Sequence, residues 1–140
     1  MEDKNLDVLA INETRLSKSI SDTCVHIPGH DIVRKDRNRN GGGVCVYIRS
    51  TINFKTQTSL MNDIYEAVVV DIIKPNSKPF SIVYRGPGTD DNFFCYLEDV
   101  VKALDFENKE IIIIGGLNCN YLSETRNSNL RQLTAIVINT

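Results

Sequence analysis

The chain has 140 residues, of which 41% are hydrophobic and 24% are charged, and this composition suits one soluble globular domain with one core. The formal net charge of −2 excludes a strongly basic nucleic-acid binder, so any nucleic-acid contact would have to use a local patch. No apolar run reaches the roughly 20 residues that a membrane span needs. We therefore expect a single domain over residues 1–140 with no membrane partner.

The cysteines indicate a reducing compartment. They show no C-x-x-C pair and no histidine at zinc-ligand spacing. No signal-peptide pattern opens the sequence. We therefore expect an intracellular protein, with the nucleus as one possible location, and with reduced, mostly buried thiols. The four cysteines are Cys24, Cys45, Cys95 and Cys119.

The first half of the chain predicts three short strands. Polar residues 17–22 and the turn residues 27–30 separate the first two. The charged stretch Arg34–Asn40 ends in three glycines before the third strand, which is typical of a hairpin connection. The predicted strands are 8–11, one starting at 31–33, and 44–48.

The second half predicts a further hairpin followed by a helix. Apolar strands at 67–73 and 80–84 flank a turn-rich stretch at 74–79. The period then changes to that of a helix, with Asp90 and Asp91 at its start and Asn108 at its end. The helical face consists of Phe93, Leu97, Val100, Val101 and Leu104.

A run of four isoleucines, 111–114, predicts a strand buried on both faces in the middle of a layered domain. Residues 130–138 fit either a strand or a helix, and we favour a helix. Strands therefore outnumber helices. The pattern indicates an α+β chain or a layered α/β sandwich.

Four segments follow one another in an order typical of one superfamily. Together they resemble the endonuclease/exonuclease/phosphatase superfamily, and within it the endonucleases of non-LTR retrotransposons. The resemblance implies a four-layer αββα sandwich of DNase I-like type that hydrolyses phosphodiesters with Mg²⁺. It covers the chain from about Asp7 onward. The segments are DVLAINETRL (7–16), RKDRNRNGGGVCVYIR (34–49), SIVYRGPG (81–88) and IIIIGGLNCN (111–120).

The resemblance assigns roles to individual residues. Glu13 matches the metal-binding glutamate of the family, and a carboxylate at a strand end suits Mg²⁺. Tyr84 and Arg85 match the family's Tyr-Arg pair, which implies that the tyrosine contacts the phosphate or orders the active-site network. Asn118 matches the asparagine that orients the nucleophile and the phosphate. Each has an ordinary structural alternative: a solvated turn carboxylate, a half-buried strand tyrosine and a turn asparagine, respectively.

The sequence also departs from the family pattern. Gly116 stands where the family places a catalytic aspartate, and losing a general acid or base typically costs about 10²–10⁴ in rate. Asn120 stands where many relatives carry another aspartate, and Gly86 replaces a proline. Relative to the family, we expect the domain to be incomplete at both ends. His26 and His30 lie far from the position of the family's catalytic histidine, so neither is assigned that role.

A basic stretch beside the triple glycine is the candidate nucleic-acid contact. Together with Arg85, it could hold the phosphates of a DNA backbone, although a solvated loop is the plainer interpretation of such a charge run. The stretch consists of Arg34, Lys35, Arg37 and Arg39.

Three functions remain open. The first is a Mg²⁺-dependent endonuclease of retrotransposon type, impaired by Gly116 and holding its metal weakly or not at all. The second is a non-catalytic or vestigial module that binds nucleic acid. The third is a superfamily phosphatase, against which the retrotransposon-like stretch around the three glycines argues.

Overall fold

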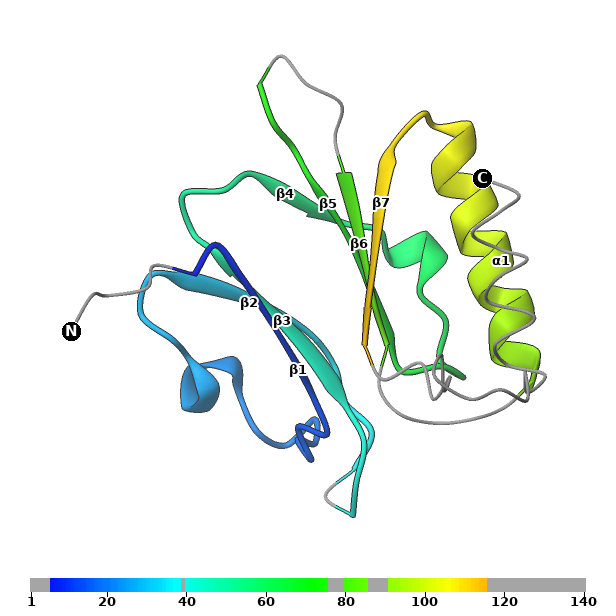
Figure 1. Cartoon of the computed structure of the whole chain (residues 1–140). Coiled ribbons are helices and arrows are strands. Elements are labelled where there is room, and N and C mark those ends of the chain that lie inside the picture. The colour runs from blue at the N-terminus through cyan, green and yellow to red at the C-terminus, as the bar shows by residue number, and fades with distance from the viewer. Residues whose placement is uncertain (1–5, 39, 76–79, 86–90, 116–140) are drawn as a thin grey trace, which may run out of the picture.

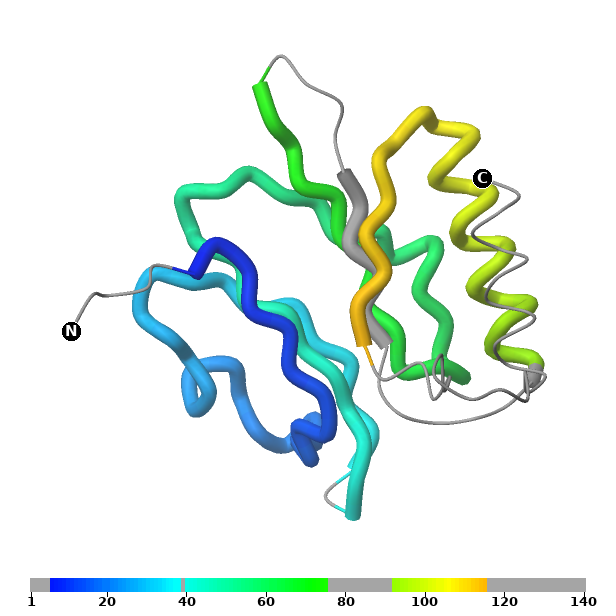
Figure 2. The backbone as a smooth tube through the Cα atoms, viewed as in Figure 1, coloured from blue at the N-terminus to red at the C-terminus, as the bar shows by residue number. Residues whose placement is uncertain are grey.

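The computed structural model of the chain describes residues 6–38, 40–75, 80–85 and 91–115, and at 80–85 and 91 it describes the backbone (Figures 1 and 2). The predicted hairpins, helix and isoleucine strand are all present. The predicted element within 130–138 lies outside the described residues. In chain order the elements are β1 (Val8–Asn12), the 3-10 helix η1 (Asp22–Val25), β2 (His30–Lys35), β3 (Val44–Arg49), β4 (Phe54–Thr56), the 3-10 helix η2 (Thr58–Leu60), β5 (Ala67–Ile72), β6 (Phe80–Arg85), α1 (Asp91–Phe106) and β7 (Glu110–Gly115).

The first sheet has three antiparallel strands in the order β1-β3-β2. Its central strand, β3, is buried from Val44 to Ile48. The loop before β2 lies against the outer face of this sheet, where the hydroxyl of Tyr47 donates to the carbonyl of Val25 at 2.7 Å. Because β2 continues to Lys35, it includes Arg34 and Lys35, which the sequence pattern had placed in the loop.

The second sheet has four strands in the order β4-β5-β6-β7. β4 and β5 are antiparallel, as are β5 and β6, whereas β6 and β7 are parallel and are joined by α1. A parallel pair needs such a crossover connection, usually a helix. The helix ends as predicted near Asn108, which has a φ of 58°, while the amide of Lys109 donates to the carbonyl of Leu104 at 3.3 Å.

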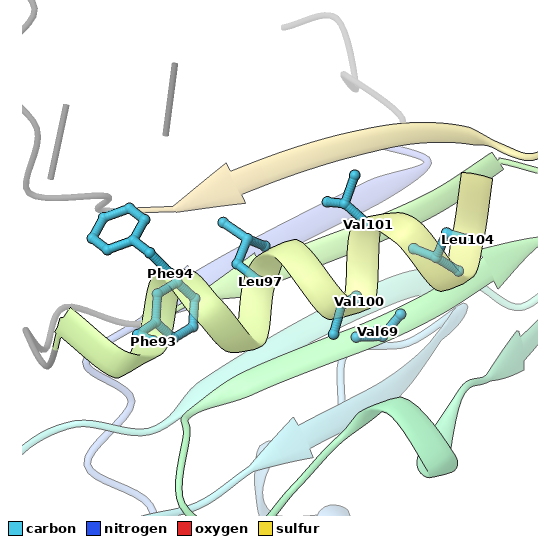
Figure 3. Packing of buried hydrophobic residues seen from close by; sticks show 7 residues of the cluster. All are labelled: Val69, Phe93, Phe94, Leu97, Val100, Val101 and Leu104. Atoms are coloured by element: carbon cyan, nitrogen blue, oxygen red, sulfur yellow. The ribbon is translucent and has the colours of Figure 1, made fainter. Parts of the chain in front are cut away.

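The core has two parts, one on each face of β5. Val68 and Val70 pack with Val44, Val46 and Ile48 of β3 between the two sheets. Side chains of a strand point alternately to opposite faces, so Val69 points to the other side, where it packs against the apolar face of α1 (Figure 3). β5 is therefore buried on both faces, as β3 also is, which explains the apolar run at 67–70.

The described residues thus form two sheets that pack against each other, with α1 on the other face of the second sheet (Figure 1). The apolar face of α1 is the one that the sequence predicted. In Figure 3 it covers the second sheet and β7 runs beside it. The residues that α1 contributes to this layer are Phe93, Phe94, Leu97, Val100, Val101 and Leu104.

Two expectations about burial were wrong. β7 is the last strand of its sheet among the described strands, and although Ile111 and Ile113 pack toward α1, Ile112 and Ile114 are 45% and 37% exposed. The strand is therefore covered on one face and partly open on the other. The described cysteines are free, as expected, but Cys24 and Cys95 are exposed and Cys45 alone of these three is buried.

Candidate functional site

The ends of several strands meet at one edge of the two-sheet structure, namely the edge that runs across the strand ends and not along an outer strand. In the second sheet, Ala67, Arg85 and Gly115 form one row of paired residues, at the start of β5 and the ends of β6 and β7. In the first sheet, Asn12 at the end of β1 pairs with Val44 at the start of β3. The residues that immediately precede or follow these rows therefore gather in one place, and they include Glu13.

The turn of three glycines between β2 and β3 of the first sheet is hydrogen-bonded at this edge to a residue that precedes β5 of the second sheet. The amide of Gly42 donates to Oε2 of Glu13 at 2.9 Å, and the amide of Gly43 donates to Oε2 of Glu66, also at 2.9 Å. The segment that follows β1 pairs with the same turn, because the amide of Arg15 donates to the carbonyl of Gly42 at 2.9 Å. Two carboxylates from different sheets are thus held by neighbouring peptide groups.

At two of these glycines, an added side chain would come too close to neighbouring side chains. Gly42 and Gly43 have φ values of +78° and +84°, in the left-handed region that favours glycine. A Cβ at Gly42 would lie 2.7 Å and 2.8 Å from the two carboxylate oxygens of Glu66, and one at Gly43 would lie 2.5 Å from Oγ1 of Thr14. A side chain at either position would therefore be strained by its φ and would have to displace a neighbouring side chain.

Glu13 lies just after β1 with a φ of 53°, a backbone conformation that is uncommon for a residue with a side chain. It is exposed, and its carboxylate is oriented by the bond from Gly42. Mg²⁺ takes oxygen ligands and usually keeps several waters beside one or two carboxylates, so Glu13 fits such an ion as a single protein ligand. The described parts of the chain contain no cluster of three His, Cys, Asp or Glu side chains that could hold a metal by themselves.

The basic stretch is largely neutralised by acidic neighbours. Lys35 Nζ lies 3.0 Å from Asp63 Oδ1, and Arg37 Nη1 lies 3.3 Å from Glu66 Oε1. The side chain of Arg37 remains 59% exposed, whereas that of Lys35 is 21% exposed. Arg37 is therefore the described member of the stretch that is best placed to meet a phosphate, and Arg39 lies outside the described residues.

Arg34 is committed to the protein itself. Its Nε lies 3.0 Å from Asp22 Oδ1 and 3.6 Å from Asp36 Oδ2, and its Nη2 donates to the carbonyl of Ile20. The side chains of Arg34 and Asp36 are 15% and 6% exposed. Arg34 thus ties the segment before β2 to the outer face of the first sheet. This packing argues against the predicted phosphate contact.

The remaining predicted residues are placed by the backbone or lie beyond it. Tyr84 pairs with Val68 and Ile114 in β6, one residue before the row that contains Arg85. Arg85 itself lies in the row that ends at Gly115, so the backbone brings it to the same edge as Glu13. Asn118, Gly116 and Asn120 lie outside the described residues.

The described histidine that belongs to a strand is far from this edge. His30 pairs with Arg49, at the opposite end of the β2–β3 ladder from Lys35 and Val44. Its Nε2 lies 2.9 Å from the carbonyl oxygen of Leu6. His26 is exposed and follows η1. The placement of His30 therefore gives it no part in the edge that holds Glu13.

Glu66 is the residue of this edge that the sequence patterns did not single out. It precedes the buried strand β5, and its side chain is 17% exposed although it carries a charge. The available signals were a glutamate directly before the apolar run at 67–70 and a triple glycine whose amides need hydrogen-bond acceptors. Neither signal specifies a partner, because the contact joins residues that are 23 positions apart.

Comparisons with known proteins extend this picture. A family model described as Endonuclease/Exonuclease/phosphatase family matches residues 1–133. A similar solved structure is the endonuclease domain of TRAS1, a telomere-specific non-LTR retrotransposon, with a TM-score of 0.65 and 14% sequence identity. The match covers 95% of this chain and 57% of that one, so the chain spans little more than half of the length of the TRAS1 domain.

At this level of identity the likeness to TRAS1 shows a shared, DNase I-like fold. A comparison with curated protein sequences gave no match. Among the described residues, no helix is both long enough and apolar enough to cross a membrane.

Proposed function

The chain belongs to the endonuclease/exonuclease/phosphatase family, and on this premise we propose that it is a nuclease-like domain of retrotransposon type whose own sequence impairs its catalysis. One observation carries the nuclease assignment. Glu13, the residue that matches the family's metal ligand, is held by the glycine turn at the edge where β6 and β7 end. The proposed reaction class is Mg²⁺-dependent hydrolysis of a phosphodiester in DNA.

The roles of the chain's residues follow from the charges in such a reaction. A bound Mg²⁺ would neutralise the phosphate and favour attack by water. Glu13 would ligate this ion, and the bond from Gly42 would fix the direction of its carboxylate. By resemblance, Tyr84 would contact the phosphate and Asn118 would orient the nucleophile. The backbone of β6 supports this by bringing Tyr84 and Arg85 toward the edge.

The nucleic-acid contact that we propose is narrower than the whole basic stretch. Arg37 is exposed beside the glycine turn and could exchange its contact with Glu66 for a phosphate. Lys35 is paired with Asp63 and could add a weaker contact to the DNA backbone. Arg85 could add another, because it lies in the row of residues at the ends of β6 and β7. The ion pairs of Arg34 with Asp22 and Asp36 argue against a direct contact of this side chain with DNA.

The impairment rests on Gly116. Glycine has no side chain to carry the proton that the family's aspartate handles, and such a loss typically lowers the rate by about 10²–10⁴. The same residue favours the second candidate function, a non-catalytic module that binds nucleic acid. The retrotransposon-like stretch around the three glycines argues against the third candidate, a phosphatase acting on a small molecule.

Nicking of supercoiled plasmid in the presence of Mg²⁺ tests this proposal. We expect the purified chain to show little or no nicking and the Gly116→Asp variant to nick the plasmid. Adding Glu13→Ala to Gly116→Asp should abolish this nicking. Robust nicking by the parent chain that needs Glu13 would refute the impairment. If Gly116→Asp leaves the protein folded but inactive, while DNA is still bound, the non-catalytic binding module is favoured instead.

A further inference from the structure

Glu66 lies beside Glu13 in the site but is not a ligand candidate itself. We propose that Glu66 is a positioning residue, which clamps the glycine turn so that the amide of Gly42 holds the Glu13 carboxylate in one orientation. This role rests on the proposed function, because it supposes that the direction of Glu13 matters for metal binding.

Both oxygens of Glu66 are already engaged. Oε2 accepts the amide of Gly43 at 2.9 Å, and Oε1 lies 3.3 Å from Nη1 of Arg37. Its side chain is 17% exposed, so these bonds are partly shielded from water. A carboxylate that is occupied in this way acts through the groups it binds.

The clamp acts on a single peptide plane. The carbonyl of Gly42 and the amide of Gly43 belong to the same peptide group, which is planar. The carbonyl accepts the amide of Arg15 at 2.9 Å, and the amide donates to Glu66 at 2.9 Å, so the plane is held from both sides. The amide that binds Glu13 is separated from this plane by the two backbone torsions of Gly42 alone.

Glycine makes such a clamp necessary. It has more conformational freedom than any other residue, and three successive glycines give the turn no preferred orientation of its own. Glu66 also occupies the space that a side chain at Gly42 would need, since a Cβ there would lie 2.7 Å from its Oε1. The bare turn and the carboxylate are therefore complementary in shape.

The experiment measures the Gly42 amide directly. Hydrogen exchange of Gly42 is followed by NMR in the full chain and in Glu13→Ala, Glu66→Ala and Glu66→Gln. We expect Glu66→Ala to speed exchange about tenfold, the factor for losing one hydrogen bond. Glu66→Gln keeps an oxygen acceptor for Gly43 and is expected to change the rate less than about threefold. Glu98→Ala, which removes an exposed glutamate paired with Lys102, is the matched control.

Mn²⁺ serves as the metal probe in the same samples. Mn²⁺ should broaden the backbone amide signal of residue 13 in the parent chain, and this broadening should be lost in Glu13→Ala. Glu66→Ala should weaken Mn²⁺ affinity about tenfold, as expected for an outer-shell partner. Glu66→Gln should restore most of this affinity. If Glu66→Ala does not fold, Glu66→Asp shortens the reach by one methylene and is expected to show the same losses.

The outcomes separate the two proposals. Unchanged Gly42 exchange in a folded Glu66→Ala or Glu66→Asp protein would overturn the clamp. Faster exchange without any Glu13-dependent broadening by Mn²⁺ in the parent would support the clamp but refute the metal role of Glu13. An equal loss of Mn²⁺ affinity in Glu98→Ala would show a nonspecific charge effect and would also overturn the positioning role.

Discussion

Nζ of Lys109 lies 2.6 Å from Oδ2 of Asp71, and both side chains are less than a tenth exposed. Asp71 belongs to β5, and Lys109 lies in the connection between α1 and β7. Asp71 also accepts a bond from Nε2 of Gln57, and Lys109 also pairs with Glu107. Burial disfavours the charged form of Lys109, but its bonds to Asp71 and Glu107 outweigh this and raise its pKa. The pair fastens the helix and the last strand to the middle of the sheet.

Breaking this pair should destabilise the fold. Lys109→Met would leave the buried Asp71 carboxylate without its ammonium partner, and we expect the free energy of unfolding to fall by about 3 kcal/mol. Urea unfolding followed by circular dichroism measures the change. Lys102→Met, which removes the exposed pair with Glu98, should shift stability by less than about 0.5 kcal/mol. Equal effects of the two substitutions would contradict this interpretation.

Gly42→Ala and Gly29→Ala separate backbone strain from steric conflict. Both positions have a φ of +78°, but a Cβ at Gly29 would meet nothing within 4 Å, whereas one at Gly42 would meet Glu66 and Arg37. Gly29→Ala should therefore cost about 1 kcal/mol of stability from the φ alone, and Gly42→Ala clearly more. Urea midpoints measure both variants, and equal losses would show that Glu66 can move aside at little cost.

Arg34 and Arg37 should differ in what they support. Arg34→Met would leave the buried Asp36 without its partner and is expected to lower stability by about 2–3 kcal/mol. Arg37→Ala should change stability by less than about 1 kcal/mol but weaken DNA binding and reduce its salt dependence by about one phosphate contact. Fluorescence anisotropy with a DNA duplex at several salt concentrations tests this. A reduced salt slope in a fully stable Arg34→Met protein would contradict the assignment.

The described thiols should react at very different rates. Burial, followed by the nearby charge of Asp36, raises the pKa of Cys45 to about 11. Cys24 and Cys95 are exposed. At pH 8, a rise of about two units lowers the thiolate fraction about 100-fold, so iodoacetamide should modify Cys45 at least that much more slowly. Peptide mapping by mass spectrometry measures each site, and labelling in urea should remove the difference.

Tyr96 should make the fold sensitive to alkali. Burial raises its pKa from 10.0 to about 12, and its hydroxyl donates to the carbonyl of Leu60 at 2.6 Å. Because the folded pKa is the higher one, the neutral phenol stabilises the fold fully below about pH 10, and this contribution is lost as the pH rises toward 12. The urea midpoint should fall over this range less steeply in Tyr96→Phe than in the parent. Parallel curves would show that Tyr96 is not responsible.

The sequence predicted the elements whose side-chain period is long enough to see. The helical face from Phe93 to Leu104 and the apolar strands β3 and β5 were found because burial in the two parts of the core orders their residues. β4 was missed because its three residues, Phe54–Thr56, are too short to show a period. β7 was misjudged because an apolar run states what a strand could bury and not where it lies in the sheet.

Glu13 was predicted as a site residue through its match to the family's metal ligand, whereas its place at a strand end alone favoured a solvated carboxylate. The fold brings Glu13 to the edge shared by Arg85. Glu66 and Arg34 could not be interpreted from the sequence, because their roles depend on partners far along the chain. An ion pair between two elements neutralises both charges, and the composition of the sequence does not show which charges are paired in this way.

The position of β1 also affects when Glu13 reaches the edge that holds the candidate site during folding. β1 lies at the edge of its sheet, and β3 is its sole hydrogen-bonded neighbour among the described strands. The β2–β3 hairpin can close locally, whereas β1 must find β3 across a long loop, which delays its pairing during folding. Short edge strands also open at a lower free energy than buried ones. The carboxylate of Glu13, the proposed metal ligand, therefore follows a strand that we expect to pair late and to open at a low free energy, so this segment could detach while the core remains folded.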